Sequence, residues 1–336
     1  MNNRHLTSFK VENFKRFASF EMTNLGMFNL ILGDNNVGKT SVLEALLVCD
    51  NSWELFNRLL VALDYRKLKS SYEYEDIRQY VHRSNAEQET SSKINFIQSQ
   101  SNGVSSHISI EFDSYRGRVS VKGIPGDSTE YPLVSNVSPS RNSSTPFIPF
   151  YKGHDEDLTR FYSRIQSNRS AKKAFVKSLA TFVPDIEDIE LSSPFPGQVP
   201  HLIVSQKQMD ATIPLALFGD GTLKLFRLLA EISINKGRRL MIDEVDTGIH
   251  FTRYKDFWKI VLQSAFENEV QLFMTTHNIE CIRFFKEVLE VDLQKFQDES
   301  RCISLVENSV TKQVSAHTFS FTEFEHAINV GNEIRI

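Results

Sequence analysis

The feature that most constrains this chain is a stretch of eight residues, Gly-Asp-Asn-Asn-Val-Gly-Lys-Thr, which begins at Gly33. It matches the pattern G-x-x-x-x-G-K-[ST], and it lies between the apolar run 27–32 and a segment with helical spacing of apolar residues. Glycines let the backbone curl so that its N–H groups face an anion, and the following helix N-terminus adds a positive dipole. The context predicts a strand, a phosphate-binding loop and a helix.

The residue types in this loop indicate a nucleoside triphosphate with Mg²⁺, and we expect ATP. Lys39 is predicted to reach the β- and γ-phosphates, and the Thr40 hydroxyl is predicted to bind Mg²⁺. The loop as a whole is expected to surround the phosphates. Its predicted binding residues are Gly33, Asp34, Asn35, Asn36, Val37, Gly38, Lys39, Thr40 and Ser41.

A second candidate element is an apolar run, 240–242, that ends in the adjacent carboxylates Asp243 and Glu244. Successive side chains of a strand point to opposite sides, so the two acids can have different roles. Asp243 is predicted to hold Mg²⁺, directly or through water, and Glu244 is predicted to orient and polarise the attacking water. Taken alone, the pair could also be an ordinary surface pair at a strand end; the phosphate loop favours the catalytic interpretation.

Two further segments are ambiguous in isolation. His277 follows a buried apolar run and could be a hydrogen-bonded core histidine. The turn Gly219-Asp220-Gly221-Thr222 opens a predicted helix and could be an ordinary helix cap or an anion site. Their positions are informative, because His277 lies 33 residues beyond Glu244 and the turn precedes the carboxylate strand by about twenty residues. ABC-type ATPases have a switch histidine and a signature motif at such positions.

With these motifs in order, the chain resembles the RecF/OLD-like ABC ATPases, especially the bacterial AAA15-type ATP-binding proteins. The resemblance covers nearly the whole chain and is weakest from 60 to 140. The segments that carry it, besides the phosphate loop, are Glu12–Phe17, Phe147–Phe150, Pro214–Leu215, Gly219–Thr222, Ile242–His250, Thr275–Cys281 and Gly331–Arg335.

The resemblance implies an α/β fold, an ABC-type ATPase head (a P-loop NTPase, RecF/SMC-like) with an antiparallel β N-terminal lobe and a helical or irregular insertion. It also implies that ATP is held between two chains, in a homodimer or higher homo-oligomer. One chain would contribute Lys39, Thr40, Asp243, Glu244 and His277, and the other would contribute the turn 219–222 to the γ-phosphate.

Two segments depart from the family pattern. Residues 245–250 lie where a D-loop is expected, but their sequence differs from that of transporter ATPases. For the Q-loop, the best candidate is Gln98 on a predicted strand; an unrelated surface glutamine is the alternative.

The chain divides into three expected parts. Residues 1–60 would hold the first strands, the phosphate loop and a helix, 61–200 the second part of the N-terminal lobe with a helical insertion, and 201–336 the C-terminal lobe. The composition of residues 135–146 predicts an exposed loop. The sequence has no sustained heptad repeat, so long coiled-coil arms are not expected. The predicted strands are Leu6–Val11, Phe17–Met22, Met27–Leu32, Ile94–Gln98, His107–Phe112, Arg118–Val121, Leu240–Ile242, Val270–Met274, Cys302–Glu307 and Lys312–Phe319. Besides the helix after the loop, the predicted helices are Asp157–Phe182, Thr222–Ile232, Tyr254–Phe266, Ile279–Leu289 and Thr322–Asn329.

Composition limits the partners. The 336 residues carry a formal net charge of −4, so DNA binding would need a local patch such as 66–69 or a partner. Three scattered cysteines lack metal or disulfide spacing, the N-terminus lacks a signal-peptide pattern, and no apolar run is long enough to span a membrane. We therefore expect a cytoplasmic protein without a membrane partner.

The resemblance also implies a function. OLD-family nucleases carry a Toprim domain after such a head, but only about 50 residues follow the helix after His277 here, so nuclease activity is not expected. Related stand-alone proteins are ATPase subunits of two-component anti-phage defence systems such as PARIS, in which a separately encoded Toprim-like nuclease is the toxic effector. Two alternatives stay open, namely a RecF-like DNA-repair ATPase and a nucleotide-gated assembly that barely hydrolyses ATP.

Overall fold

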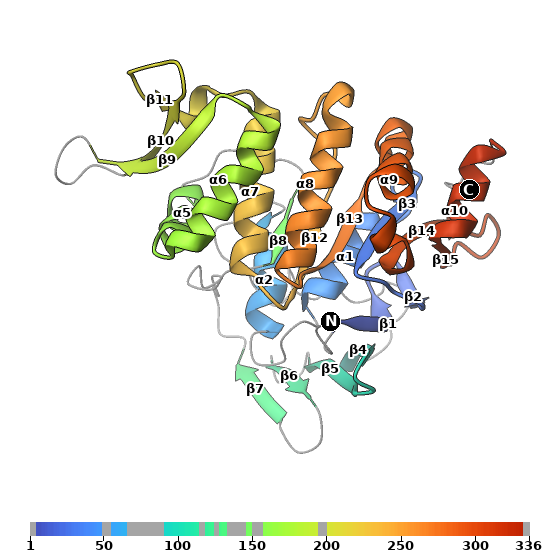
Figure 1. Ribbon diagram of the computed structural model, residues 1–336. Helices are drawn as coiled ribbons and strands as arrows, with labels where there is room; N and C mark the ends of the chain where they lie inside the picture. The colour runs from blue at the N-terminus through green and yellow to red at the C-terminus, as the bar shows by residue number, and fades with distance from the viewer. Residues whose placement is uncertain are drawn as a thin grey trace.

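A computed structural model describes eight stretches of the chain, which build two large sheets and the helices around them (Figure 1). The described residues are 5–48, 55–65, 91–113, 118–123, 128–132, 146–149, 157–193 and 200–331.

One sheet is antiparallel and has the strand order β2-β1-β4-β5-β6-β7. Its first two strands form a hairpin in which Phe14 pairs with Phe17, so the turn is very short. Burial alternates over part of each strand, with Phe9 and Val11 of β1 buried and paired with the buried Met22 and Phe20 of β2. The strands are β1 (Leu6–Phe14), β2 (Phe17–Met22), β4 (Ser91–Gln100), β5 (Ser105–Asp113), β6 (Arg118–Lys122) and β7 (Ser128–Pro132).

The other large sheet has the order β15-β14-β3-β13-β12-β8, and all its neighbours are parallel except β15. Every residue of β3, β12 and β13 is buried, which explains why these strands are mostly apolar in the sequence. The strands are β3 (Phe28–Gly33), β8 (Phe147–Ile148), β12 (Arg239–Ile242), β13 (Gln271–Thr275), β14 (Ser300–Glu307) and β15 (Val314–Ser320).

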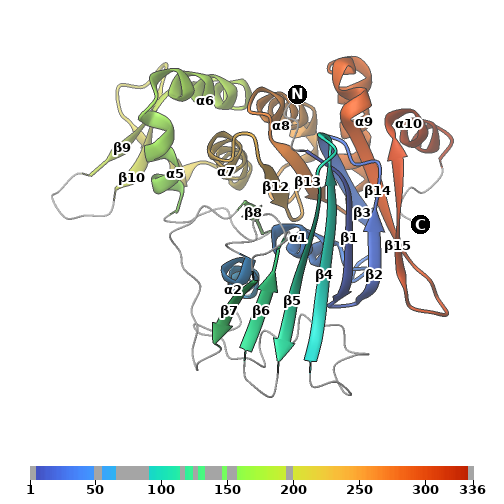
Figure 2. The ribbon, with the colours of Figure 1, turned by 90° about the horizontal axis from the view of Figure 1, so that it is seen from below.

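Helices cover both faces of this parallel sheet. On one face, α1 packs in a core that it shares with the antiparallel sheet, and Figure 2 shows the two alongside each other. On the other face, α5 to α9 pack against Leu30, Leu240 and Met274. The helices are α1 (Lys39–Val48), α2 (Leu55–Tyr65), α5 (Asp157–Gln166), α6 (Arg169–Phe182), α7 (Asp220–Ile234), α8 (Tyr254–Glu267), α9 (Ile279–Val291) and α10 (Phe321–Asn329).

A small third sheet extends from the α5–α6 side of the molecule (Figure 1). It contains β9 (Ile186–Ser192), β10 (His201–Gln206) and β11 (Ile213–Pro214), all antiparallel. The sequence predicts none of these strands, because their alternation is short and weak.

The predicted elements of the last third are confirmed within a few residues at each end. The helical prediction for residues 157–182 is confirmed, but the segment forms two helices and not one. The break is at Asn168, whose side chain accepts hydrogen bonds from the backbone N–H groups of Ser170 and Ala171 and so starts α6 anew. Predictions for 135–145, for 66–69, for Phe150 and for 332–335 fall outside the described residues.

None of the helices in the described part of the chain has the length and hydropathy needed to span a bilayer.

Candidate functional site

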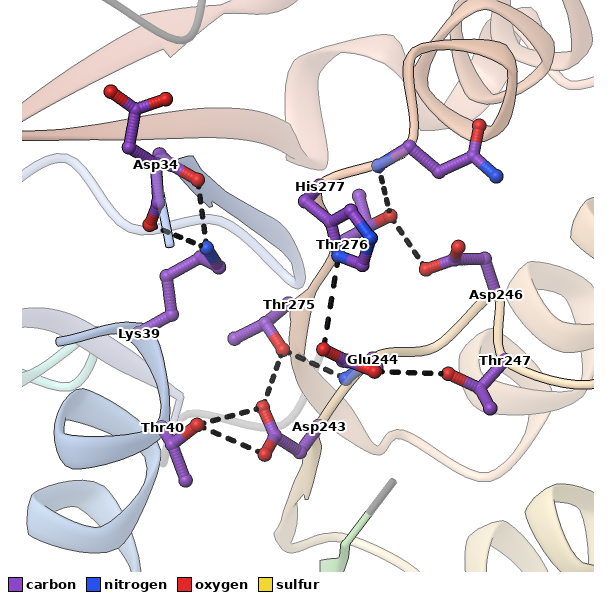
Figure 3. A network of polar contacts seen from close by, with 12 residues as sticks. Asp34, Lys39, Thr40, Asp243, Glu244, Asp246, Thr247, Thr275, Thr276 and His277 are labelled. Carbon is purple, nitrogen blue, oxygen red and sulfur yellow. Dashed lines mark hydrogen bonds and ion pairs between the residues drawn. The ribbon is translucent and has the colours of Figure 1, made fainter. Parts of the chain in front are cut away.

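The candidate site lies at one edge of the parallel sheet, where β3, β12 and β13 end. In register, Ile31 of β3 is opposite Thr275 of β13, and Met274 is opposite Ile242 of β12. Because parallel strands have their carboxyl ends at the same edge, motifs that are far apart in the sequence meet there. Figure 3 shows the resulting cluster.

The phosphate loop depends on backbone conformations and close contacts that only glycine allows at two positions. Gly33 has a φ of 144° and Gly38 a φ of 110°. A Cβ on Gly33 would lie 2.9 Å from the Leu305 carbonyl oxygen, and one on Gly38 would lie 2.8 Å from Arg16 Cδ. The loop shape is therefore a consequence of these glycines.

Lys39 folds back over the loop. Its Nζ donates to the carbonyl oxygens of Gly33 at 2.7 Å and Asp34 at 2.8 Å. The first turn of α1 carries no acidic residue that would neutralise the helix dipole. The ammonium and the helix N-terminus thus form one positive region, which suits an anionic ligand.

Asp243 faces the loop and accepts two hydroxyl hydrogen bonds. Thr40 Oγ1 lies 3.0 Å from Oδ2, and Thr275 Oγ1 lies 2.7 Å from Oδ1. Burial raises the pKa of the Asp243 carboxyl, while the hydrogen bonds from Thr275 and Thr40 act in the opposite direction. A bound cation or a positive neighbour would therefore favour the ionised form.

The Thr40 hydroxyl and the Asp243 carboxylate fit Mg²⁺. No cluster of three or more His, Cys, Asp or Glu side chains suited to a metal occurs among the described residues. Mg²⁺ does not need such a cluster, since it takes one or two protein oxygens and completes its shell with phosphates and water. The facing hydroxyl and carboxylate oxygens are donors of that type.

Glu244 points to the other side of Thr275 (Figure 3). Its backbone N–H donates to Thr275 Oγ1 at 2.8 Å, and its Oε2 accepts from Thr247 Oγ1 at 3.3 Å. His277 Nδ1 lies 3.8 Å from Oε1, and the His277 side chain is 50% exposed. His277 is therefore not a core histidine, and it shares the open side of the site with Glu244.

Thr275 and Arg16 are site residues that the sequence motifs do not single out. Thr275 contacts both acids, and a hydroxyl residue at the end of a buried strand is a weak signal. Arg16 donates to the carbonyl oxygen of Asn36 in the loop and pairs with Glu307. It therefore fastens the β1–β2 turn and β14 to the loop.

The turn 219–222 begins α7 and lies against the segment after β12. Gly219 is the residue before the helix, and a Cβ there would meet nothing within 4 Å. A Cβ on Gly221 would lie 3.1 Å from the Gly248 carbonyl oxygen. The structure thus gathers Lys39, the two acids and His277 (Figure 3), while the turn lies close to the D-loop position of its own chain and has an exposed tip.

Gln98 is not part of the site, so the Q-loop interpretation is wrong; the residue is unrelated to the site, as the alternative has it, but it is buried and not on the surface. It is buried, and its Oε1 accepts from Arg239 at 3.1 and 3.2 Å. Arg239 begins β12, whereas Asp243 follows the other end of that strand. Gln98 therefore connects β4 to the beginning of β12, at the end of that strand opposite the site.

Family profiles match most of the chain in two parts. Residues 5–137 match the profile described as "AAA ATPase domain". Residues 137–283 match the one described as "AAA domain, putative AbiEii toxin, Type IV TA system". The matches support an ATPase of the ABC/AAA type.

A relative and solved structures agree with this. A Helicobacter pylori protein named "ATP/GTP phosphatase" is 24% identical over 336 positions, covering 84% of this chain and 88% of that protein. An SMC head bound to the winged-helix domain of ScpA has a TM-score of 0.60 at 12% identity, covering 97% of this chain and 99% of that one. An SMC head from Thermotoga maritima has a TM-score of 0.50 at 11% identity, covering 94% and 99%.

The structural likeness establishes the fold. The chain has the fold of an ABC-type ATPase head, with an antiparallel β lobe, α1 between its sheets and an inserted helical part. The relative and the profiles support nucleotide hydrolysis.

Proposed function

We propose that the protein binds ATP with Mg²⁺ and hydrolyses it to ADP and phosphate. The observation that carries this is that one hydroxyl, Thr275 Oγ1, joins two acids with different surroundings. Asp243 is buried against Thr40 of the phosphate loop, whereas the Glu244 carboxylate is part-exposed beside His277. This is a division between a cation ligand and a group that can orient water.

Each side chain then has a defined task. Lys39 would leave the loop carbonyls and bind the β- and γ-phosphates, because phosphate oxygens are stronger acceptors. Mg²⁺ at Thr40 and Asp243 would neutralise charge on the phosphate oxygens. Glu244 would accept a hydrogen bond from the attacking water, and His277 would donate to the γ-phosphate from the same open side.

A second copy of the chain would complete the site. The accessible turn at Gly219 has Leu217 beside it with 75% of its surface exposed, and Phe251 follows the D-loop position with 53% exposed. Such exposed apolar side chains beside an anion-binding helix end are suited to a face that closes on another chain. ATP would then hold two heads together.

The catalytic proposal is tested with purified protein. Lys39→Ala is expected to abolish ATP binding. Glu244→Gln is expected to keep ATP binding, accumulate ATP-bound dimers in light scattering and release phosphate about 100-fold more slowly. Equal phosphate release by wild type and Glu244→Gln would remove Glu244 from the mechanism and favour a nucleotide-gated assembly.

In the cell, we propose that this ATPase is the sensor or scaffold subunit of an anti-phage defence system with a separately encoded Toprim-like nuclease. The profile over 137–283 supports this, because its description names a toxin of a type IV toxin–antitoxin system. Protection of bacteria against phage should need the ATPase, its Lys39 and the neighbouring effector gene together. An intrinsic nuclease in the purified chain, abolished by a substitution within it, would refute this division of labour.

The alternative, a RecF-like DNA-binding ATPase, has one observation in its favour. Residues 158–182 contain no acidic residue, and most of their cations on α5 and α6 are exposed. The exposed members are Arg160, Arg164, Arg169, Lys173 and Lys177. DNA binding that weakens steeply with salt and is lost in an Arg164→Glu, Lys173→Glu variant would favour this alternative.

A further inference from the structure

Lys224 is a buried lysine that the proposed mechanism does not use. It lies four residues after Asp220, the first residue of α7, and only 3% of its surface is exposed. Its Nζ donates to the backbone carbonyl oxygen of Glu244 at 3.4 Å. A lysine is rarely buried unless its charge is paired, because removing the ammonium group from water costs free energy.

The charged groups around Lys224 include the two acids of the site, Asp243 and Glu244. Asp243, Glu244 and Asp246 act on it as acids, and Arg227 of its own helix acts as a cation. Burial lowers the pKa of Lys224 to about 8, although the acids oppose this shift. Holding the ammonium group in this buried position therefore costs desolvation free energy, which a methionine or leucine side chain would not.

The carbonyl that Lys224 contacts belongs to a residue with a rare backbone conformation. Glu244 has a φ of 46°, in the left-handed region that is unfavourable for a non-glycine residue. Its peptide groups are fixed from two sides. The N–H donates to Thr275 Oγ1, and the carbonyl accepts from the Thr247 N–H at 3.1 Å as well as from Lys224.

The same helix carries the accessible turn at its start. A Cβ on Gly221 would lie 3.1 Å from the Gly248 carbonyl oxygen, and Gly248 has a φ of 81°. The N-terminal half of α7 therefore lies close to the loop that contains Glu244 at two places, at Gly221, where a side chain would have little room, and at Lys224, which donates to the Glu244 carbonyl.

We propose that Lys224 is a positioning residue that transmits the state of the turn 219–222 to Glu244 of the same chain. Nucleotide held against the turn by a second copy would shift α7, and Lys224 would then fix the Glu244 carbonyl and the left-handed backbone that aims its carboxylate. This inference rests on the proposed ATPase function. It explains why a charged side chain is kept where an apolar one would pack.

The first experiment separates binding from turnover. Lys224→Met is expected to lower kcat about 10- to 100-fold while the Kd for ATP changes less than about twofold, because misplaced catalytic groups affect turnover. Lys224→Arg, which keeps a cationic donor, is expected to recover part of kcat. The matched control is Lys286→Met on α9, a lysine paired with Glu290 away from the site, which should leave kcat unchanged.

The second experiment tests the direction of coupling with mixed dimers. When Lys224→Met and Glu244→Gln are in the same chain, its wild-type partner keeps Lys224 and Glu244 together, and about half the activity should remain. When they are in different chains, both sites should fail. The reverse pattern would show that Lys224 acts on the nucleotide of the other chain and would overturn the proposal.

The outcomes also separate this proposal from the one it rests on. A wild-type protein without ATPase activity would overturn the proposed function and the role of Lys224 together. An active wild type with an equally active, folded Lys224→Met variant would overturn only the role of Lys224.

Discussion

The Thr275 hydroxyl donates to Asp243 Oδ1 at 2.7 Å and accepts the backbone N–H of Glu244 at 2.8 Å. One fully buried side chain thus fixes both acids of the candidate site relative to β13. The two acids cannot shift independently while this hydroxyl is present.

Thr275→Val is therefore expected to keep the fold and lower phosphate release about 10- to 100-fold. Valine has the shape of threonine but leaves an unsatisfied N–H and a carboxylate with one donor fewer, at a cost of about 1–3 kcal/mol. Steady-state kinetics and thermal unfolding check this. Ser300→Ala, which also removes a buried strand hydroxyl, should lower stability without a comparable loss of activity.

Gly38→Ala is expected to abolish nucleotide binding and to lower stability by more than the same change at Gly103. Both glycines have positive φ, 110° and 80°, so both variants carry backbone strain. Only at Gly38 would the new Cβ collide with Arg16 and Phe17, whereas at Gly103 nothing lies within 4 Å. Fluorescent-nucleotide binding and urea unfolding measure the two effects. Equal losses of stability would contradict the close contact at Gly38.

Lys224 gives a pH dependence with a definite sign. Its pKa is about 8 in the folded protein, against 10.5 for an ordinary exposed lysine. Between these values the unfolded chain holds a proton that the folded protein has lost, so the free energy of unfolding rises with pH. The total rise is about 3 kcal/mol.

Lys224→Met lacks this contribution. Urea unfolding of both proteins from pH 7.5 to 10.5 should give the variant the larger free energy of unfolding at pH 7.5. The difference between the two proteins should shrink as the pH rises. A constant difference across the range would contradict the lowered pKa.

Asn168→Ala tests the break between α5 and α6. The substitution removes the side chain that accepts from Ser170 and Ala171 N–H groups, and it should cost about 1 kcal/mol of stability. ATPase activity should stay unchanged, because the cap lies on the inserted helical part. A differential scanning measurement beside a phosphate-release assay checks both, and a variant of unchanged melting temperature would contradict the cap.

Much of the fold is predictable from local patterns. The buried runs of β3, β12 and β13 are mostly apolar, and the helices α7 to α9 have clear spacing. Strands β9 and β10 are not predicted, because they belong to a small sheet with weak alternation. Asn168 is not recognised as a helix start, because the apolar spacing continues across it.

For the site, the residues adjacent to strand ends are predictable and their supporting contacts are not. Lys39, Asp243 and Glu244 stand out because a glycine pattern and a carboxylate pair follow apolar runs. Gln98 cannot be placed from sequence, because its partner Arg239 is 141 positions away. Lys224 carries no signal at all until the Glu244 carbonyl is seen beside it.

Local sequence is enough to predict the phosphate-binding loop and the carboxylate pair, since glycine spacing and apolar runs involve only a few neighbouring residues. It does not reveal that Thr275 joins the two acids, that His277 is exposed or that Lys224 reaches Glu244. These relationships arise from the parallel order of β3, β13 and β12, which brings segments more than 200 residues apart to one edge. Side-chain contacts depend on distance in space, and here the register of buried strands sets that distance.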